Sequence, residues 1–240
     1  MSYAPIRPRA RLGFIIPSSN RMVEPNMHRY LPPDIVPHFI RIGMTNRHRA
    51  PLPELLPRIL ATADLLNDSK CDAIIFQCTG TSMSGGVDGD NEVLSEIARA
   101  TGRPAISTAS AVAAALNALD ARRIVFISET KQAGHDKKSA YLREAGYELV
   151  ADKAVGLAGS DDYCAAPPSL WFDTALALKI DAAEAYFISC ANIQAIDVIE
   201  DLEGALGKPV VTSNQAALWR ALRILGIADA LPDLGQLLRR

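Results

Sequence analysis

The sequence has 240 residues, of which 49% are hydrophobic and 22% are charged, and its mean hydropathy is +0.08. This composition excludes an intrinsically disordered chain, and the length is enough for one large or two small hydrophobic cores. The formal charge of −2 and the pI near 6.1 exclude the strongly basic balance of a nucleic-acid binder, so we expect a small-molecule ligand. No apolar run reaches the roughly 18 residues of a membrane span and no secretory signal is evident, so we expect no membrane association and a cytoplasmic location.

Short apolar runs typical of buried parallel strands alternate with amphipathic segments of helix length. In chain order, the predicted strands are 12–16, 73–76, 104–107, 124–128, 185–189 and 209–212. The predicted helices are 52–68, which Pro57 is expected to break early, and 91–100, 110–120, 137–146, 192–203 and 215–225. This alternation predicts an α/β fold whose parallel sheets are flanked by helices.

One unit of the sequence occurs twice. The segment GRPAISTASA (102–111) aligns with GKPVVTSNQA (207–216), and each combines a Gly-basic-Pro turn, a short strand, two hydroxyl residues and the start of a helix. Upstream of each segment, a predicted strand ends at a cysteine, Cys78 in the first copy and Cys190 in the second. The repeat predicts two similar halves related by a pseudo-twofold axis, with the two cysteines facing each other.

The last predicted helix is expected to return to the first half. We therefore assign residues 1–112 together with 213–240 to the first α/β half and residues 113–212 to the second, with the active site between them.

The repeated cysteines are the strongest candidates for chemistry, because ligands of open α/β sheets bind at the carboxyl ends of strands. A free thiol is only a few per cent thiolate at neutral pH, so a reactive cysteine needs amide donors or a helix N-terminus nearby. Cys78 is followed by a loop of small residues whose backbone amides suit an anion, namely Thr79, Gly80, Thr81 and Ser82. Cys190 precedes a helix predicted to begin near Asn192. We interpret Cys71 and Cys164 as packing residues.

Other polar positions permit two interpretations. Ser18 and Asn20 follow the first predicted strand and suit a carboxylate or carbonyl, but taken alone they are more typical of a turn and helix cap. Arg41, Arg47, His48 and Arg49 form a basic cluster that fits a solvated face or subunit contact better than substrate binding. Dinucleotide, phosphate-loop and zinc-ligand spacings are absent from the sequence, so no cofactor and no metal are expected.

Four segments resemble the aspartate/glutamate racemase superfamily: GFIIPSSNRMVEP (13–25), QCTGTS (77–82), ISCANIQAID (188–197) and GKPVVTSNQAALW (207–219). Within it, the chain is most similar to the maleate cis-trans isomerases, with the arylmalonate decarboxylases as relatives. The resemblance covers nearly the whole chain. It implies a cofactor-independent, homodimeric or larger enzyme made of two flavodoxin-like halves.

The resemblance also implies a mechanism. Cys78 would add as a thiolate to the alkene of a small unsaturated dicarboxylate of the maleate type, while Cys190 handles the proton as acid and base. Substrate-contacting Tyr and Asn residues of the family align with Lys131 and Ser160. The implied substrate-binding set is Ser18, Asn20, Thr79, Gly80, Thr81, Ser82, Lys131, Ser160, Ala191 and Asn192.

Three alternatives stay open from the sequence. A racemase or epimerase of a small carboxylate compound also needs two acid/base groups. A decarboxylase is disfavoured by Cys78, because the decarboxylases that the chain resembles keep only the second cysteine. A non-catalytic small-acid binding protein is suggested by Lys131 and Ser160, since both depart from the family pattern.

Overall fold

The computed structural model describes residues 7–45 and 48–240, which contain two four-stranded parallel sheets. The first sheet has the order β2-β1-β3-β4 and the second β6-β5-β7-β8. The strands of the first are β1 (Ala10–Pro17), β2 (Ile35–Ile42), β3 (Ala73–Phe76) and β4 (Ala105–Ser107). Those of the second are β5 (Arg123–Ser128), β6 (Glu148–Ala154), β7 (Ala185–Ser189) and β8 (Val210–Thr212). The predicted α/β class with two parallel sheets is therefore confirmed.

Helices cover both sheets. The first half contains α1 (Val23–Tyr30), α2 (Leu52–Asp68), α3 (Thr79–Ser82), α4 (Gly86–Thr101) and α5 (Thr108–Ala118). Then follow α6 (Gln132–Glu144), α7 (Ser160–Ala165), α8 (Pro168–Ala177), α9 (Ile199–Leu206) and α10 (Ser213–Ile224). Short 3₁₀ segments lie at Ile196–Val198, Pro232–Leu234 and Gln236–Arg239. None of the helices in the described residues is both long and apolar enough to cross a membrane.

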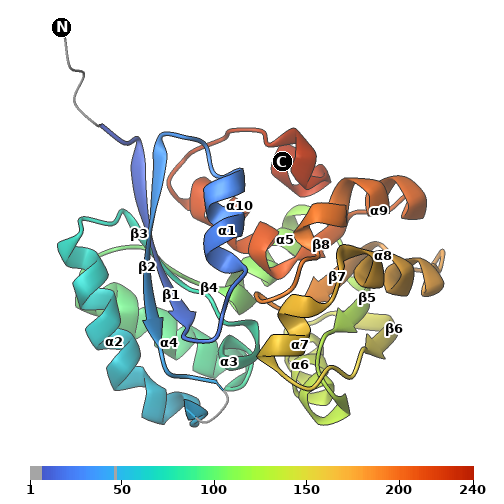
Figure 1. The fold of residues 1–240 in the computed structure, drawn as a ribbon, viewed down its shortest axis with the longest axis horizontal. Coiled ribbons are helices and arrows are strands. Elements are labelled where there is room, and N and C mark those ends of the chain that lie inside the picture. Colours follow the sequence, from blue (N-terminus) through green and yellow to red (C-terminus); the bar gives the residue numbers. More distant parts are fainter. Residues whose placement is uncertain (1–6, 46–47) are drawn as a thin grey trace, which may run out of the picture.

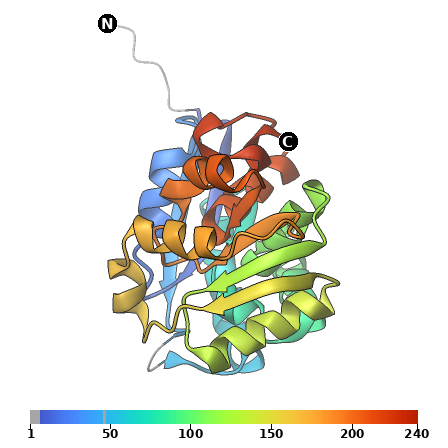
Figure 2. The same ribbon diagram turned by 90° about the vertical axis from the view of Figure 1, so that its right-hand side faces the viewer.

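The two sheets lie side by side, and α5 and α10 pack against each other between them (Figure 1). Figure 2, turned by 90° from Figure 1, brings the second sheet to face the viewer, with β5 and β6 adjacent and α6 along them. Helix α10 contacts β3 and β4 of the first sheet as well as β8 of the second. The larger of two hydrophobic clusters consequently runs through both halves, and a second lies in the first half. The residue limits assigned to the two halves stay a prediction.

The internal repeat is visible in the backbone. Gly102 ends α4 with φ +66° and Gly207 ends α9 with φ +67°, a left-handed conformation that glycine adopts without strain. The helix that follows each short strand then begins with a capping box, Ser107 with Ser110 and Thr212 with Gln215. The repeat was correctly interpreted as a duplicated structural unit.

Four local expectations differ from the structure. The edge strands β2 and β6 were not predicted, and neither were α1 and α8. Helix α2 is not broken by Pro57, because the one hydrogen bond that the proline forfeits is to the Pro53 carbonyl near the helix start. The helix expected at 192–203 is wrong at its beginning, because residues 192–195 form a turn and α9 starts at Ile199.

Candidate active site

A cavity of about 630 Å³ lies at the carboxyl ends of the strands and is lined by residues of both halves. Nine of the predicted site residues line it: Asn20, Cys78, Thr79, Gly80, Thr81, Ser160, Cys190, Ala191 and Asn192. The structure thus brings the two repeated cysteines to one cavity, as the repeat predicted.

Three predicted residues lie outside this lining. Ser18 is exposed beyond the end of β1, and Lys131 is exposed at the start of α6. Ser82 is fully buried, where its hydroxyl donates to the Thr79 carbonyl and accepts the Ala109 N–H. Its role in the structure is to hold the loop after Cys78.

Cys78 follows β3 and directly precedes the short helix α3. The residue is 7% exposed, and its thiol donates a hydrogen bond to Thr81 Oγ1 at 3.1 Å. Burial raises the pKa of the Cys78 thiol, whereas hydrogen bonds from Thr81 and the positive charge of Lys138 oppose that rise. The expected small-residue loop therefore stabilises a thiolate at this sulfur in part.

Cys190 follows β7 and has φ +125°, a region that non-glycine residues rarely occupy. Its N–H donates to Ser213 Oγ at 3.0 Å, and its sulfur accepts the Asn192 N–H at 3.3 Å. The helix dipole expected at this sulfur is missing, because Asn192 lies in a turn. Burial, followed by the charge of Glu129, raises the pKa of Cys190 well above its ordinary value.

The start of α10 ties the two cysteine loops together. Ser213 Oγ accepts hydrogen bonds from the Cys190 N–H and from Thr79 Oγ1, both at 3.0 Å. Asn214 accepts from Gln77 Nε2 at 3.0 Å and donates to the Ala191 carbonyl at 3.2 Å. The second copy of the repeat therefore supplies the residues that fix both thiols relative to each other.

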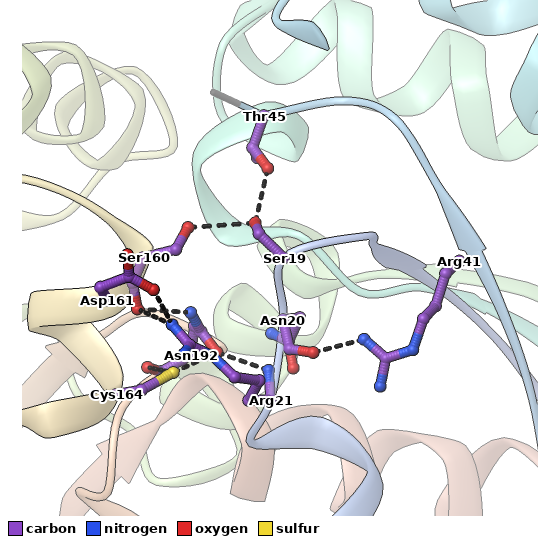
Figure 3. Close-up of polar contacts among 9 residues, drawn as sticks. All are labelled: Ser19, Asn20, Arg21, Arg41, Thr45, Ser160, Asp161, Cys164 and Asn192. Carbon is purple, nitrogen blue, oxygen red and sulfur yellow. Dashed lines mark hydrogen bonds and ion pairs between the residues drawn. The ribbon is translucent and has the colours of Figure 1, made fainter. Parts of the chain in front are cut away.

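Asn20 connects the loop after β1 to the loop after β7. Its Oδ1 caps α1 by accepting from Met22 and Val23 N–H groups, and its Nδ2 donates to the Ala191 carbonyl at 2.9 Å. In return, Asn192 Oδ1 accepts the Arg21 N–H at 2.8 Å (Figure 3). Asn20 is thus a cap that also lines the cavity, and its role in substrate binding stays a prediction.

The N-terminus of α7 is held to the first half in the same way. Ser160 Oγ donates to Ser19 Oγ at 3.0 Å, and Ser19 shares a 2.9 Å hydrogen bond with Thr45 (Figure 3). Arg21 pairs with Asp161 at 2.6 Å. These contacts place α7 against the cavity.

Cys164 of α7 lies behind this lining. Its thiol donates to Asn192 Oδ1 at 3.0 Å (Figure 3). Cys71 is completely buried between a helix and a strand, and burial raises its pKa to about 11. Neither thiol lines the cavity.

Sequence reasoning missed four lining residues with titratable side chains, namely Glu129, Lys137, Lys138 and Tyr163. Glu129 directly follows β5, so its position at a strand end was an available signal. Tyr163 comes from α7 and contacts Thr130. The resemblance aligned a tyrosine of the family with Lys131, after β5, whereas the tyrosine that lines the cavity is Tyr163 of α7.

The residues of the basic cluster have different surroundings. Arg41 pairs with Glu24 and with the Asn20 carbonyl, which is a structural role. Arg49 lines the cavity, whereas Arg47 lies outside the described residues. Across residues 7–45 and 48–240, no three His, Cys, Asp or Glu side chains are grouped so that they could hold a metal ion.

Comparison with known proteins places the chain among relatives of known activity. A family model described as arylmalonate decarboxylase matches residues 12–238. The maleate isomerase of Nocardia farcinica is 28% identical over 240 residues, which covers 96% of each chain. The arylmalonate decarboxylase of Bordetella bronchiseptica is 27% identical over 174 residues, which covers 70% of this chain and 72% of the relative.

The fold is also similar to that of a solved structure. A variant of the Nocardia farcinica maleate cis-trans isomerase with a covalently bound succinylcysteine intermediate has a TM-score of 0.89 at 24% identity. The match covers 96% of this chain and 98% of the other.

Proposed function

Because the chain belongs to the arylmalonate decarboxylase family, we propose that this maleate isomerase-like enzyme interconverts the cis and trans forms of a small unsaturated dicarboxylate. The observation that carries the proposal is the opening of Cys78 and Cys190, from opposite halves, onto one cavity. The relatives named maleate isomerase support the same reaction class. The match to the one from Nocardia farcinica covers 96% of this chain.

The reaction begins with the thiolate of Cys78. Its sulfur adds to one alkene carbon, and the π electrons move to the neighbouring carbon, where the adjacent carboxylate delocalises them. The former double bond becomes a single bond, so rotation about it is possible. Asn20 and Asn192 each have a second amide hydrogen that no acceptor in the described part of the chain takes, and these hydrogens suit the developing negative charge.

Cys190 completes the cycle. Its thiol donates a proton to the carbanion, which gives a saturated adduct bound to Cys78 through a carbon–sulfur bond. After rotation, the Cys190 thiolate removes a proton from the same carbon, the alkene re-forms, and the carbon–sulfur electrons return to Cys78. A saturated adduct of this kind agrees with the succinylcysteine intermediate in the Nocardia farcinica isomerase.

The direct test is to measure the conversion of maleate to fumarate by the purified protein with proton NMR. Cys78→Ala removes the nucleophile, so turnover is expected to fall at least about 1000-fold. Cys71→Ala is the matched control, because this cysteine is buried away from the cavity. Absence of wild-type turnover, or equal turnover in Cys78→Ala, contradicts the proposal.

A racemase or epimerase acting at a carbon next to a carboxylate is the second candidate. It is favoured by two cysteines that follow strands of different sheets and line one cavity, a pair that could remove a proton from one face of a carbon and deliver one to the other. This activity predicts deuterium from the solvent in recovered chiral substrate, a need for both cysteines, and no conversion of maleate. The cytoplasmic location and the homo-oligomeric state remain predictions.

A further inference from the structure

A buried ion pair lies in the wall of the cavity. Lys138 Nζ is 2.7 and 2.6 Å from the two carboxylate oxygens of Glu129, and both residues are 5% exposed. Both line the cavity together with Cys78 and Cys190. Removing two charges from water costs several kcal/mol per ion, so such a pair is weak as a purely stabilising device. Its position beside two thiols suggests an effect on their ionisation.

The two members of the pair lie next to different cysteine loops. In the register of the second sheet Ser128 pairs with Ser189, so Glu129 and Cys190 leave neighbouring strands side by side. Lys138 comes from α6 and lies beside the other loop, because its Cε is 4.0 Å from the position that a Cβ on Gly80 would take. The carboxylate is therefore next to Cys190, and the lysine is next to the loop that follows Cys78.

Lys138 lowers and Glu129 raises the pKa of both thiols, but the larger of these two effects differs between Cys78 and Cys190. The pKa of Cys78 is raised by burial and lowered by Lys138, with Glu129 making only a smaller opposing contribution. At Cys190 the order is reversed, because Glu129 raises the pKa more than Lys138 lowers it. Tyr163, Lys137 and Arg49 are the other titratable groups in the lining. Burial raises the pKa of the Tyr163 phenol, which therefore stays neutral near pH 7.

The corresponding position in the first half carries no charge. Ile127 pairs with Ile188, two residues before Cys190, and Ile15 pairs with Phe76, two residues before Cys78. Two residues after Ile127 stands Glu129, whereas two residues after Ile15 stands Pro17. The duplicated fold therefore places a carboxylate next to one of its two thiols only.

We propose that the Glu129–Lys138 pair divides the work between the cysteines, with Lys138 stabilising the thiolate of Cys78 and Glu129 keeping Cys190 protonated. Lys138 has three ammonium hydrogens and Glu129 accepts two; no other acceptor in the described chain takes the third, which is available to a thiolate. Both are positioning residues that act through the thiols. The assignment of nucleophile and proton donor rests on the proposed function, whereas the order of ionisation does not.

The test measures the rate of alkylation by iodoacetamide as a function of pH. Peptide mass spectrometry quantifies the labelling of each cysteine. Because only the thiolate reacts, the midpoint of each rate–pH curve reports the pKa of that thiol. Restricted access scales the rate without moving the midpoint, and the exposed fractions of Cys78 and Cys190 are similar at 7% and 9%. In the wild type we expect Cys78 to have the lower midpoint.

The informative variant combines Glu129→Gln with Lys138→Met, which removes both charges and leaves no unpaired buried ion. We expect the midpoint of Cys78 to rise, because the lowering by Lys138 exceeds the rise caused by Glu129, so that its labelling at a fixed pH below the midpoint slows. The midpoint of Cys190 is expected to fall, which narrows the difference between the thiols. Lys153→Met, on the exposed edge strand β6, removes a charge outside the cavity and serves as the control.

Glu129→Gln alone provides a second test if the double variant does not fold. It removes the negative charge that raises both pKa values, so both midpoints are expected to fall, and that of Cys190 by more. Unchanged midpoints in these variants, or a lower midpoint for Cys190 than for Cys78 in the wild type, overturn the proposal. An intact order of ionisation without maleate turnover would instead refute the proposed function and leave the effect of the pair on the thiols standing.

Discussion

Replacing Ser213 by alanine tests whether the start of α10 holds the two cysteine loops together. The Ser213 side chain is completely buried, and its oxygen is the acceptor for two buried donors, the Cys190 N–H and the Thr79 hydroxyl, each at 3.0 Å. A buried donor left without a partner costs about 1–3 kcal/mol. Two such donors predict a loss of about 2–6 kcal/mol in the free energy of unfolding, measured by urea titration. Turnover should also fall, because Cys190 loses the contact that holds its unusual backbone conformation.

The repeat supplies the matched control, because Thr108 stands at the position of α5 that corresponds to Ser213. Thr108 is equally buried, but its hydroxyl has no hydrogen-bond partner within residues 7–45 and 48–240. Thr108→Val preserves the shape and removes only this hydroxyl, so we expect a change of less than about 1 kcal/mol. If Ser213→Ala costs no more than Thr108→Val, the reasoning from shared buried donors is wrong.

Two further predictions concern stability. Gly102→Ala and Gly207→Ala should each lower the free energy of unfolding by about 1 kcal/mol, because both positions have positive φ. Gly204→Ala, inside α9, should raise the free energy of unfolding by a similar amount. A different ranking of the three variants in thermal and urea unfolding contradicts this prediction. Burial raises the pKa of Asp90 to about 6 from 3.8, so the contribution of its protonated form to stability is complete below about pH 4 and is lost as the pH rises through 6. The pH-dependent loss of unfolding free energy is about 3 kcal/mol. Urea titrations between about pH 4 and 6 should show this loss in the wild type and not in Asp90→Asn. An equal pH dependence in both proteins refutes the assignment.

The inner strands and the duplicated topology could be predicted because burial on both faces leaves a clear mark on the sequence. In β3 and β7 every residue is buried, and the sequence there is a short, almost continuous apolar run. Edge strands lack that mark. β2 contains Pro37 and is mostly half-buried, while β6 carries charged residues such as Asp152, so neither has the apolar run that served as the criterion. Helix α1 was missed for a similar reason, because Pro25 lies in its first turn.

The same distinction applies to the site. Cys78, Cys190 and Asn20 were predictable because each follows a strand, and the topology of a parallel sheet alone carries such residues to one edge. Lys138 belongs to a helix with many polar residues, and only the packing of α6 decides that its ammonium group turns inward rather than to solvent. Tyr163 depends on the path of the chain from β6 to α7, which no periodicity encodes.

A duplicated fold produces two thiols in equivalent places, yet addition followed by protonation requires two thiols of different character. The difference must therefore come from residues that the repeat does not share. The strand register identifies one such residue, since Glu129 stands beside Cys190 where Pro17 stands in the other half. The equivalent positions Ser213 and Thr108 also differ, because only Ser213 accepts hydrogen bonds from the cysteine loops. The unequal residues around an equal pair of cysteines are thus where substrate preference and the direction of proton transfer should be altered by mutation.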